Sequence, residues 1–147
     1  MGTKRISESV SIDRPPADVW SAIADYSFDL EWRNNLTEMT PDPPGGPELG
    51  TKVHEVVRNM GRDYVTDGVV TELDPGTSYR FGGEGTIGGV AGGRSVRPDG
   101  NGAVFTYDIE LTPKGGTRLL GPLLGPMVRP GLKKDLARLK ELLEAER

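Results

Sequence analysis

Hydrophobic and polar positions alternate with a period of two over most of the chain and follow helical spacing only near its ends. In residues 5–13 the apolar side chains Ile6, Val10 and Ile12 share one face, and Glu8 is the exception on that face. A period of two is typical of a half-buried strand. The first element is therefore predicted to be a β-strand whose apolar face packs against a core.

Two short helices are predicted directly after this strand. Pro16 suits a first helical turn, where its missing N–H has no partner to lose. Val19, Trp20 and Ile23 then recur at helical spacing, which predicts one apolar helix face. A second short helix is expected over residues 28–34.

The middle of the chain predicts antiparallel strands joined by tight turns. Residues 51–73 are typical of a hairpin that turns at Gly61, because glycine readily takes a positive φ. Residues 74–77, Asp-Pro-Gly-Thr, match a type II turn. Residues 82–93 are so rich in glycine that the sequence leaves their strand pairing open, whereas residues 103–112 alternate clearly.

The C-terminal stretch, residues 132–147, predicts an amphipathic helix roughly 22 Å long at 1.5 Å per residue. Its apolar side chains form one stripe: Leu132, Leu136, Leu139 and Leu143. Before it, Pro122, Pro126 and Pro130 lie four residues apart. Proline inside a helix removes a hydrogen bond, so a broken or kinked entry to this helix is expected.

Length and composition favour one domain over residues 1–147. The formal net charge is −4, with acidic and basic residues interspersed, so no nucleic-acid footprint is expected. The chain has no cysteine, which excludes disulfides and Cys-based zinc sites. A single histidine cannot form a multi-histidine metal site, so we expect neither a metal nor a cofactor.

Nothing in the sequence predicts stable membrane insertion. No apolar run approaches the ~20 residues of a membrane-spanning helix, and no signal-peptide core follows the N-terminus. A cytoplasmic location is therefore the expectation. The sequence leaves open whether the protein is a monomer or a homodimer.

Several short segments together resemble the START-like (SRPBCC) superfamily, in particular its polyketide cyclase/dehydrase branch. The segments that carry the resemblance are Pro15–Trp20, Asp25, Trp32, Gly50, Val70–Pro75, Phe105–Pro113 and the terminal helix. The resemblance implies an α+β helix-grip fold, in which a seven-stranded curved antiparallel sheet wraps around a long C-terminal helix, with two short helices after the first strand. It also implies a ligand pocket between that helix and the concave sheet face, of the ~300–1,000 Å³ usual for such sites.

The candidate ligand-binding residues are mainly aromatic, because a buried tyrosine hydroxyl needs a partner that a ligand can supply. His54 is added as the natural general base if it points inward. Neither face of its strand is clearly apolar, and a histidine on the surface is the alternative that the sequence favours. Two flexible apolar side chains before the terminal helix complete the set as pocket wall. The full set is Trp32, His54, Tyr64, Tyr79, Phe81, Phe105, Tyr107, Leu123 and Met127.

Three functions remain open at this point. The first is binding of a small hydrophobic or amphipathic molecule, of the polyketide, lipid, isoprenoid or quinone type, in the internal cavity. The second is a cyclase/dehydrase-type enzyme, which needs a polar Tyr, His or Arg deep in that cavity. The third is a protein-interaction module with a residual cavity, which a collapsed interior and a large exposed apolar patch would favour.

Overall fold

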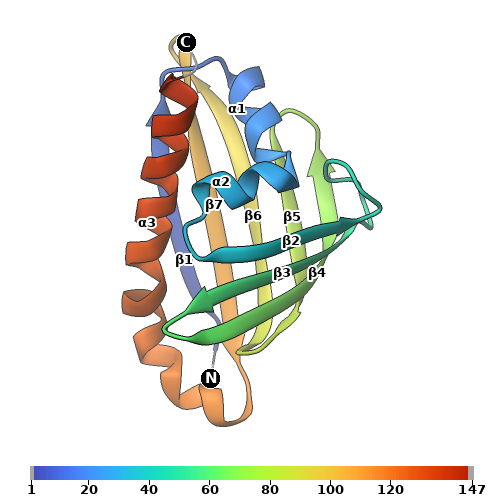
Figure 1. The fold of residues 1–147 in the computed structure, drawn as a ribbon, viewed down its shortest axis with the longest axis vertical. Helices are drawn as coiled ribbons and strands as arrows, with labels where there is room; N and C mark the ends of the chain where they lie inside the picture. The colour runs from blue at the N-terminus through green and yellow to red at the C-terminus, as the bar shows by residue number, and fades with distance from the viewer. Residues whose placement is uncertain (1, 146–147) are drawn as a thin grey trace.

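The computed structural model describes residues 2–145, which form one curved seven-stranded antiparallel sheet with helices on its concave side (Figure 1). The strand order is β1-β7-β6-β5-β4-β3-β2. The strands are β1 (Lys4–Ile12), β2 (Leu36–Asp42), β3 (Lys52–Asn59), β4 (Arg62–Asp74), β5 (Ser78–Gly85), β6 (Gly88–Asp99) and β7 (Gly102–Pro113). The helices are α1 (Pro16–Ile23), α2 (Asp29–Trp32) and α3 (Gly121–Ala145), with the 3₁₀ turns η1 (Tyr26–Phe28) and η2 (Gly115–Leu120). The helix-grip fold expected from the sequence is confirmed.

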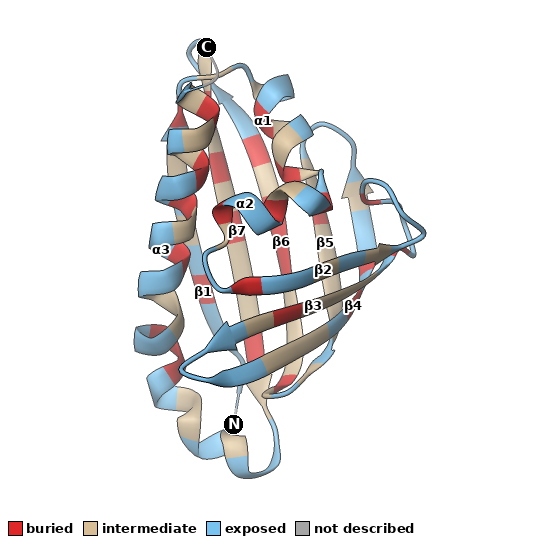
Figure 2. Cartoon of the chain, viewed as in Figure 1, coloured by how far each residue is buried: buried red, intermediate tan, exposed pale blue. Residues whose placement is uncertain are grey.

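The leucine stripe of α3 packs against the concave side of the sheet (Figure 2). Leu132, Leu136, Leu139 and Leu143 are buried, whereas the opposite face of α3 is exposed. The helix runs along the edge strand β1 (Figure 1). Apolar burial of this kind contributes about 25 cal/mol per Å² and holds the helix in place.

Strand β1 pairs with β7, and the two strands share a buried face. Ile6 lies opposite Ile109, and Val10 lies opposite Phe105. Glu8, the polar exception in the alternating pattern, accepts a hydrogen bond from Nη1 of Arg129 on α3. A half-buried carboxylate on this face is therefore neutralised by the helix that covers it.

The β3–β4 hairpin turns as the sequence predicted. Met60 and Gly61 are its two central residues, and both have positive φ, 52° and 77°. This combination matches the two-residue turn whose twist fits a hairpin. The predicted turn at Gly76 is also present, with a φ of 84° and a 2.9 Å hydrogen bond from the Thr77 N–H to the Asp74 carbonyl.

Glycines allow β5 to approach β4, and β6 to approach β7, more closely than a residue with a side chain would. The residues whose pairing the sequence left open form the β5–β6 hairpin. A Cβ atom added at Gly83 would lie 2.0 Å from the main-chain oxygen of Asp67, and one added at Gly92 would lie 2.3 Å from that of Asp108. Glycine at such positions permits the curvature that encloses an interior.

We expect the G83A variant to lose about 1–3 kcal/mol of unfolding free energy, the usual cost of inserting a methyl group where there is no room. The neighbouring G82A variant is the matched control, because nothing lies within 4 Å of a Cβ atom there. Urea unfolding followed by circular dichroism measures both. Equal stabilities for the two variants would show that the close approach at Gly83 does not matter.

Helix α3 begins eleven residues earlier than the sequence predicted, and of the broken or kinked entry expected at the prolines the break is absent. It runs continuously from Gly121 to Ala145 and contains Pro126 and Pro130. Pro122 lies in the first turn, where the lost N–H has no helical partner. All three prolines are exposed, so the carbonyls that lose a partner within the helix lie on the solvent side.

Candidate functional site

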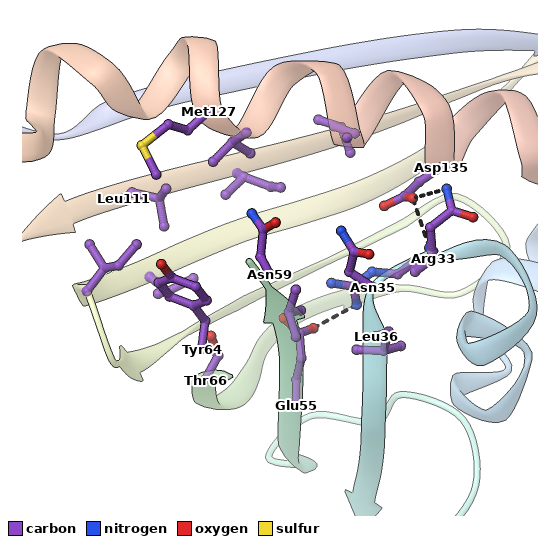
Figure 3. Close-up of a pocket in the computed structure, with 18 of the residues that line it drawn as sticks. Arg33, Asn35, Leu36, Glu55, Asn59, Tyr64, Thr66, Leu111, Met127 and Asp135 are labelled. Atoms are coloured by element: carbon purple, nitrogen blue, oxygen red, sulfur yellow. Dashed lines mark hydrogen bonds and ion pairs between the residues drawn. The ribbon is translucent and has the colours of Figure 1, made fainter. Parts of the chain in front are cut away.

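A cavity of about 600 Å³ lies between α3, the concave face of the sheet and the segment that joins α2 to β2 (Figure 3). Its walls are mostly apolar, and the apolar side chains that line it are Leu36, Val57, Val65, Ile87, Val90, Ile109, Leu111, Leu124, Met127, Val128 and Leu132. The polar side chains on its walls include Arg33, Glu55, Asn59, Tyr64, Thr66, Tyr107 and Asp135. A cavity of this size and composition suits a small molecule with an apolar body and a polar end.

A smaller chamber of about 80 Å³ adjoins this cavity and shares part of its wall. Arg33, Glu55 and Tyr107 line both spaces, so the smaller chamber continues the polar part of the large one. Tyr26 and Tyr79 are among the other residues that line it. Burial raises the pKa of Tyr79 well above its ordinary value and that of Tyr26 to about 12, so both hydroxyls stay protonated at neutral pH.

Arg33 and Glu55 form an ion pair on the cavity wall. Nη1 of Arg33 donates to Oε1 of Glu55 at 2.7 Å, and their side chains are only 10% and 20% exposed. Burial opposes both charges, but their mutual attraction outweighs it. The pKa of Glu55 lies below its ordinary value and that of Arg33 well above it, so both groups are ionised at neutral pH.

A second, fully buried ion pair, between Arg94 and Asp29, is connected to the Arg33–Glu55 pair through Asp29. Arg94 on β6 donates from both terminal nitrogens to the carboxylate of Asp29, and its Nη1 also donates to the Ile23 carbonyl at 3.0 Å. Its guanidinium lies 4.6 Å from the ring centre of Tyr107. Asp29 also accepts from Nη1 of Arg33 at 3.4 Å, so a chain of alternating charges runs from the core to the cavity.

The rim of the cavity is held by a contact between α3 and the segment after α2. Oδ1 of Asp135 accepts hydrogen bonds from the main-chain N–H of Asn34 at 3.0 Å and from its side-chain amide at 3.1 Å (Figure 3). Burial raises the pKa of Asp135, although the Asn34 donors and Arg33 act in the opposite direction. This carboxylate therefore joins α3 to the segment after α2, and both residues line the cavity.

Five of the nine candidate residues line the cavity or its adjoining chamber. Tyr64, Tyr107 and Met127 line the large cavity. Tyr79 and Phe81 line the small chamber, which Tyr107 also borders. These residues come from three strands and α3, and only the curvature of the sheet brings them together.

Trp32 and Phe105 are fully buried and lie behind the cavity wall. Their rings meet edge to face at 6.1 Å between centres, and Trp32 also meets the ring of Tyr107 at 6.3 Å. Trp32 and Phe105 therefore pack against Tyr107, which lines the cavity, but do not line the cavity themselves. Leu123 is 53% exposed, and the cavity is instead lined by Leu124, because α3 presents Leu124, Met127, Val128 and Gly131 on its inner side.

His54 lies on the outer, solvent-facing side of β3, away from the cavity. Its Nδ1 is 2.7 Å from Oδ1 of Asp67, and the two side chains are 43% and 69% exposed. The neighbouring odd-numbered residues Glu55 and Val57 line the cavity. Since successive side chains of a strand point to opposite faces, the position of Glu55 excludes His54 from the interior.

We expect His54 to titrate above the usual histidine pKa of about 6.5, because its ring bonds to the Asp67 carboxylate. A raised folded-state pKa stabilises the fold below the unfolded pKa, and this contribution is lost as the pH rises through the folded value. NMR titration of the imidazole protons should give a lower midpoint in D67N. The D63N variant is the control, because Asp63 pairs with Arg58. An unchanged midpoint in D67N would contradict the assignment.

The charged residues of the site were missed by the sequence analysis. Asp29 and Arg33 are four residues apart, a spacing at which opposite charges meet on a helix. Glu55 lies between Val53 and Val57, but Val56 lies on the opposite face of the strand, so the sequence does not show which face points inward. Neither pattern identifies a partner as distant as Arg94.

The described residues, 2–145, offer no metal site. No group of three or more His, Asp or Glu side chains among them lies close enough to hold a metal ion. No helix in the same range is long and apolar enough to cross a membrane.

The fold and the cavity between sheet and helix define a helix-grip protein, and sequence comparison identifies the family. The family model described as "Polyketide cyclase / dehydrase and lipid transport" matches residues 3–144. The chain therefore belongs to this family. Two curated Mycobacterium tuberculosis sequences, toxin Rv0910 and toxin MT0934, are each 28% identical to it over 134 residues, which cover 90% of each chain.

Solved structures share the fold at lower sequence identity. The Zhui aromatase/cyclase from Streptomyces sp. R1128 matches with a TM-score of 0.82 at 13% identity, over 97% of this chain and 94% of that one. TTHA0849 from Thermus thermophilus matches with a TM-score of 0.80 at 20% identity, over 97% and 99%. Ara h 8.0201 matches with a TM-score of 0.74 at 14% identity, over 98% and 99%. At these identities the likeness concerns the fold alone.

Proposed function

We propose that this protein binds a small amphipathic molecule in the cavity between α3 and the sheet. The observation that carries the proposal is the cavity of about 600 Å³, whose walls are mostly apolar and also carry polar side chains such as Arg33, Glu55 and Tyr107. Family membership supports the same conclusion, because the family description includes lipid transport and polyketide chemistry.

The division of the cavity wall indicates how such a molecule would lie. Leu111, Leu124 and Met127 form an apolar region between β7 and α3. Arg33, Glu55 and Tyr107 form the polar region next to the small chamber. The apolar body of the ligand would contact the first region, and its polar end would meet the second.

Two measurements test this proposal. Mass spectrometry under non-denaturing conditions should detect a small molecule that stays bound to the purified protein. N-phenyl-1-naphthylamine, an uncharged dye that fluoresces in apolar surroundings, should gain intensity with native protein and lose it after unfolding. A protein that carries no bound molecule and leaves the dye unchanged at all concentrations would contradict the proposal.

A second candidate function, an enzyme of the cyclase or dehydrase type, is favoured by the polar side chains on the cavity wall. Arg33 is placed to bind a carbonyl oxygen, and the ionised Glu55 beside it to accept a proton. Incubation with the molecule identified by mass spectrometry, followed by product analysis, tests this candidate. Turnover that is lost in E55Q while binding is kept would support it.

The interaction-module alternative is supported less well. It calls for a collapsed interior, whereas the cavity measures about 600 Å³. Exposed apolar side chains such as Met60 and Leu119 occur at the surface. Single exposed side chains of this kind are common in proteins that bind no partner.

A further inference from the structure

The charges on the walls of the cavity balance one another. Arg33 faces Glu55, and Lys134 and Asp135 are the other two charged residues on the wall of the large cavity. Arg94, the remaining charged residue of the small chamber, is compensated by Asp29. The cavity therefore has no net charge to offer a charged ligand.

The Arg33–Glu55 pair retains unused hydrogen-bonding capacity toward the cavity. Arg33 donates to the side chains of Asp29 and Glu55 through the same atom, Nη1. Within residues 2–145 its Nη2 and Nε have no hydrogen-bond partner. Glu55 uses only Oε1 within the same range. Arg33 therefore has donors, and Glu55 an acceptor oxygen, that remain available to a ligand in the cavity that both residues line.

We propose that this pair selects uncharged ligands whose polar end carries a hydroxyl group, a carbonyl group or both, and rejects carboxylates. The inference rests on the proposed function, because it names the ligand class for the same cavity. The guanidinium would donate to a carbonyl oxygen, and the carboxylate would accept from a hydroxyl. A carboxylate ligand would meet Glu55 in a partly desolvated space, where an uncompensated charge is costly.

Competition between two compounds with the same ring system tests this selectivity. N-phenyl-1-naphthylamine reports occupancy at pH 7, where 2-naphthol is neutral and 2-naphthoate is ionised. For the native protein we expect 2-naphthol to displace the dye at least about tenfold more effectively than 2-naphthoate. Equal displacement by the two compounds would overturn the inference, and a dye that does not bind would instead contradict the proposed function.

The E55Q variant tests the cause of the selectivity. It removes the negative charge and keeps an oxygen that accepts from Arg33, so 2-naphthoate should gain and 2-naphthol should lose affinity. The E72Q variant is the matched control, because Glu72 is an exposed residue of β4 outside both cavities. An unchanged ratio of the two competitors in E55Q would overturn the inference.

A double variant separates charge from altered packing. R33Q/E55Q again has a cavity without net charge, so its preference for 2-naphthol should return toward the native value. Thermal unfolding of each variant checks that it is folded at the assay temperature. A double variant that favours 2-naphthoate as E55Q does would show that packing, not charge, sets the selectivity and would overturn the inference.

Discussion

Replacement of Arg94 by methionine is expected to lower the free energy of unfolding by about 3–5 kcal/mol, the usual result of removing one partner of a buried ion pair. Asp29 is fully buried, and without Arg94 its remaining charged partner is Nη1 of Arg33 at 3.4 Å. The Ile23 carbonyl would lose its bond to Arg94 as well. Urea unfolding followed by circular dichroism measures the change.

The matched control is R97M, on the same strand. Arg97 is exposed, so its replacement should change the unfolding free energy by less than about 0.5 kcal/mol. The double variant D29L/R94M leaves no charge of this pair behind and should be more stable than R94M alone. Equal stabilities of R94M and R97M would show that the buried pair contributes little to the fold.

Filling the cavity is expected to abolish most ligand binding while leaving the fold intact. Val90 lines both the large cavity and the small chamber, so the V90W variant should place its indole ring in the space a ligand needs. We expect the dissociation constant for N-phenyl-1-naphthylamine to rise at least about tenfold, a loss of about 1.4 kcal/mol. Fluorescence titration measures this change.

The V69W variant provides the control for this experiment. Val69 on β4 is 38% exposed and lines neither cavity, so the same substitution there should leave dye binding unchanged. Circular dichroism of both variants confirms that the sheet has formed. If V90W bound the dye with the native dissociation constant, the dye would bind elsewhere, and this would contradict the cavity as the binding site.

The elements that depend on neighbours in the chain were predictable from the sequence. The hairpin at Gly61 follows from glycine's freedom to take a positive φ. The buried face of α3 follows from its leucine spacing, because residues three and four apart share one side of a helix. The start of that helix was predicted too late, because the prolines were taken to interrupt it, whereas the helix continues through Pro126 and Pro130.

The cavity residues were predictable only in part. Tyr64 and Tyr107 were found because an aromatic residue on an alternating strand indicates an interior face. His54 was a candidate only if it pointed inward; it lies on the outer face, and its neighbour Glu55 lines the cavity, since successive side chains of a strand point to opposite faces. The sequence offered no clearly apolar phase on β3 with which to choose between them.

By itself the sequence determined the order of the elements, the two turns and the apolar stripe of the last helix, because each depends on side chains within a few positions of one another. Tertiary structure alone decided which polar groups face the cavity. Arg94 reaches Asp29 across 65 residues of chain, and Arg33 reaches Glu55 across 22. Pairings over such distances in the chain depend on how the curved sheet packs against its helices. A local sequence pattern does not contain that information.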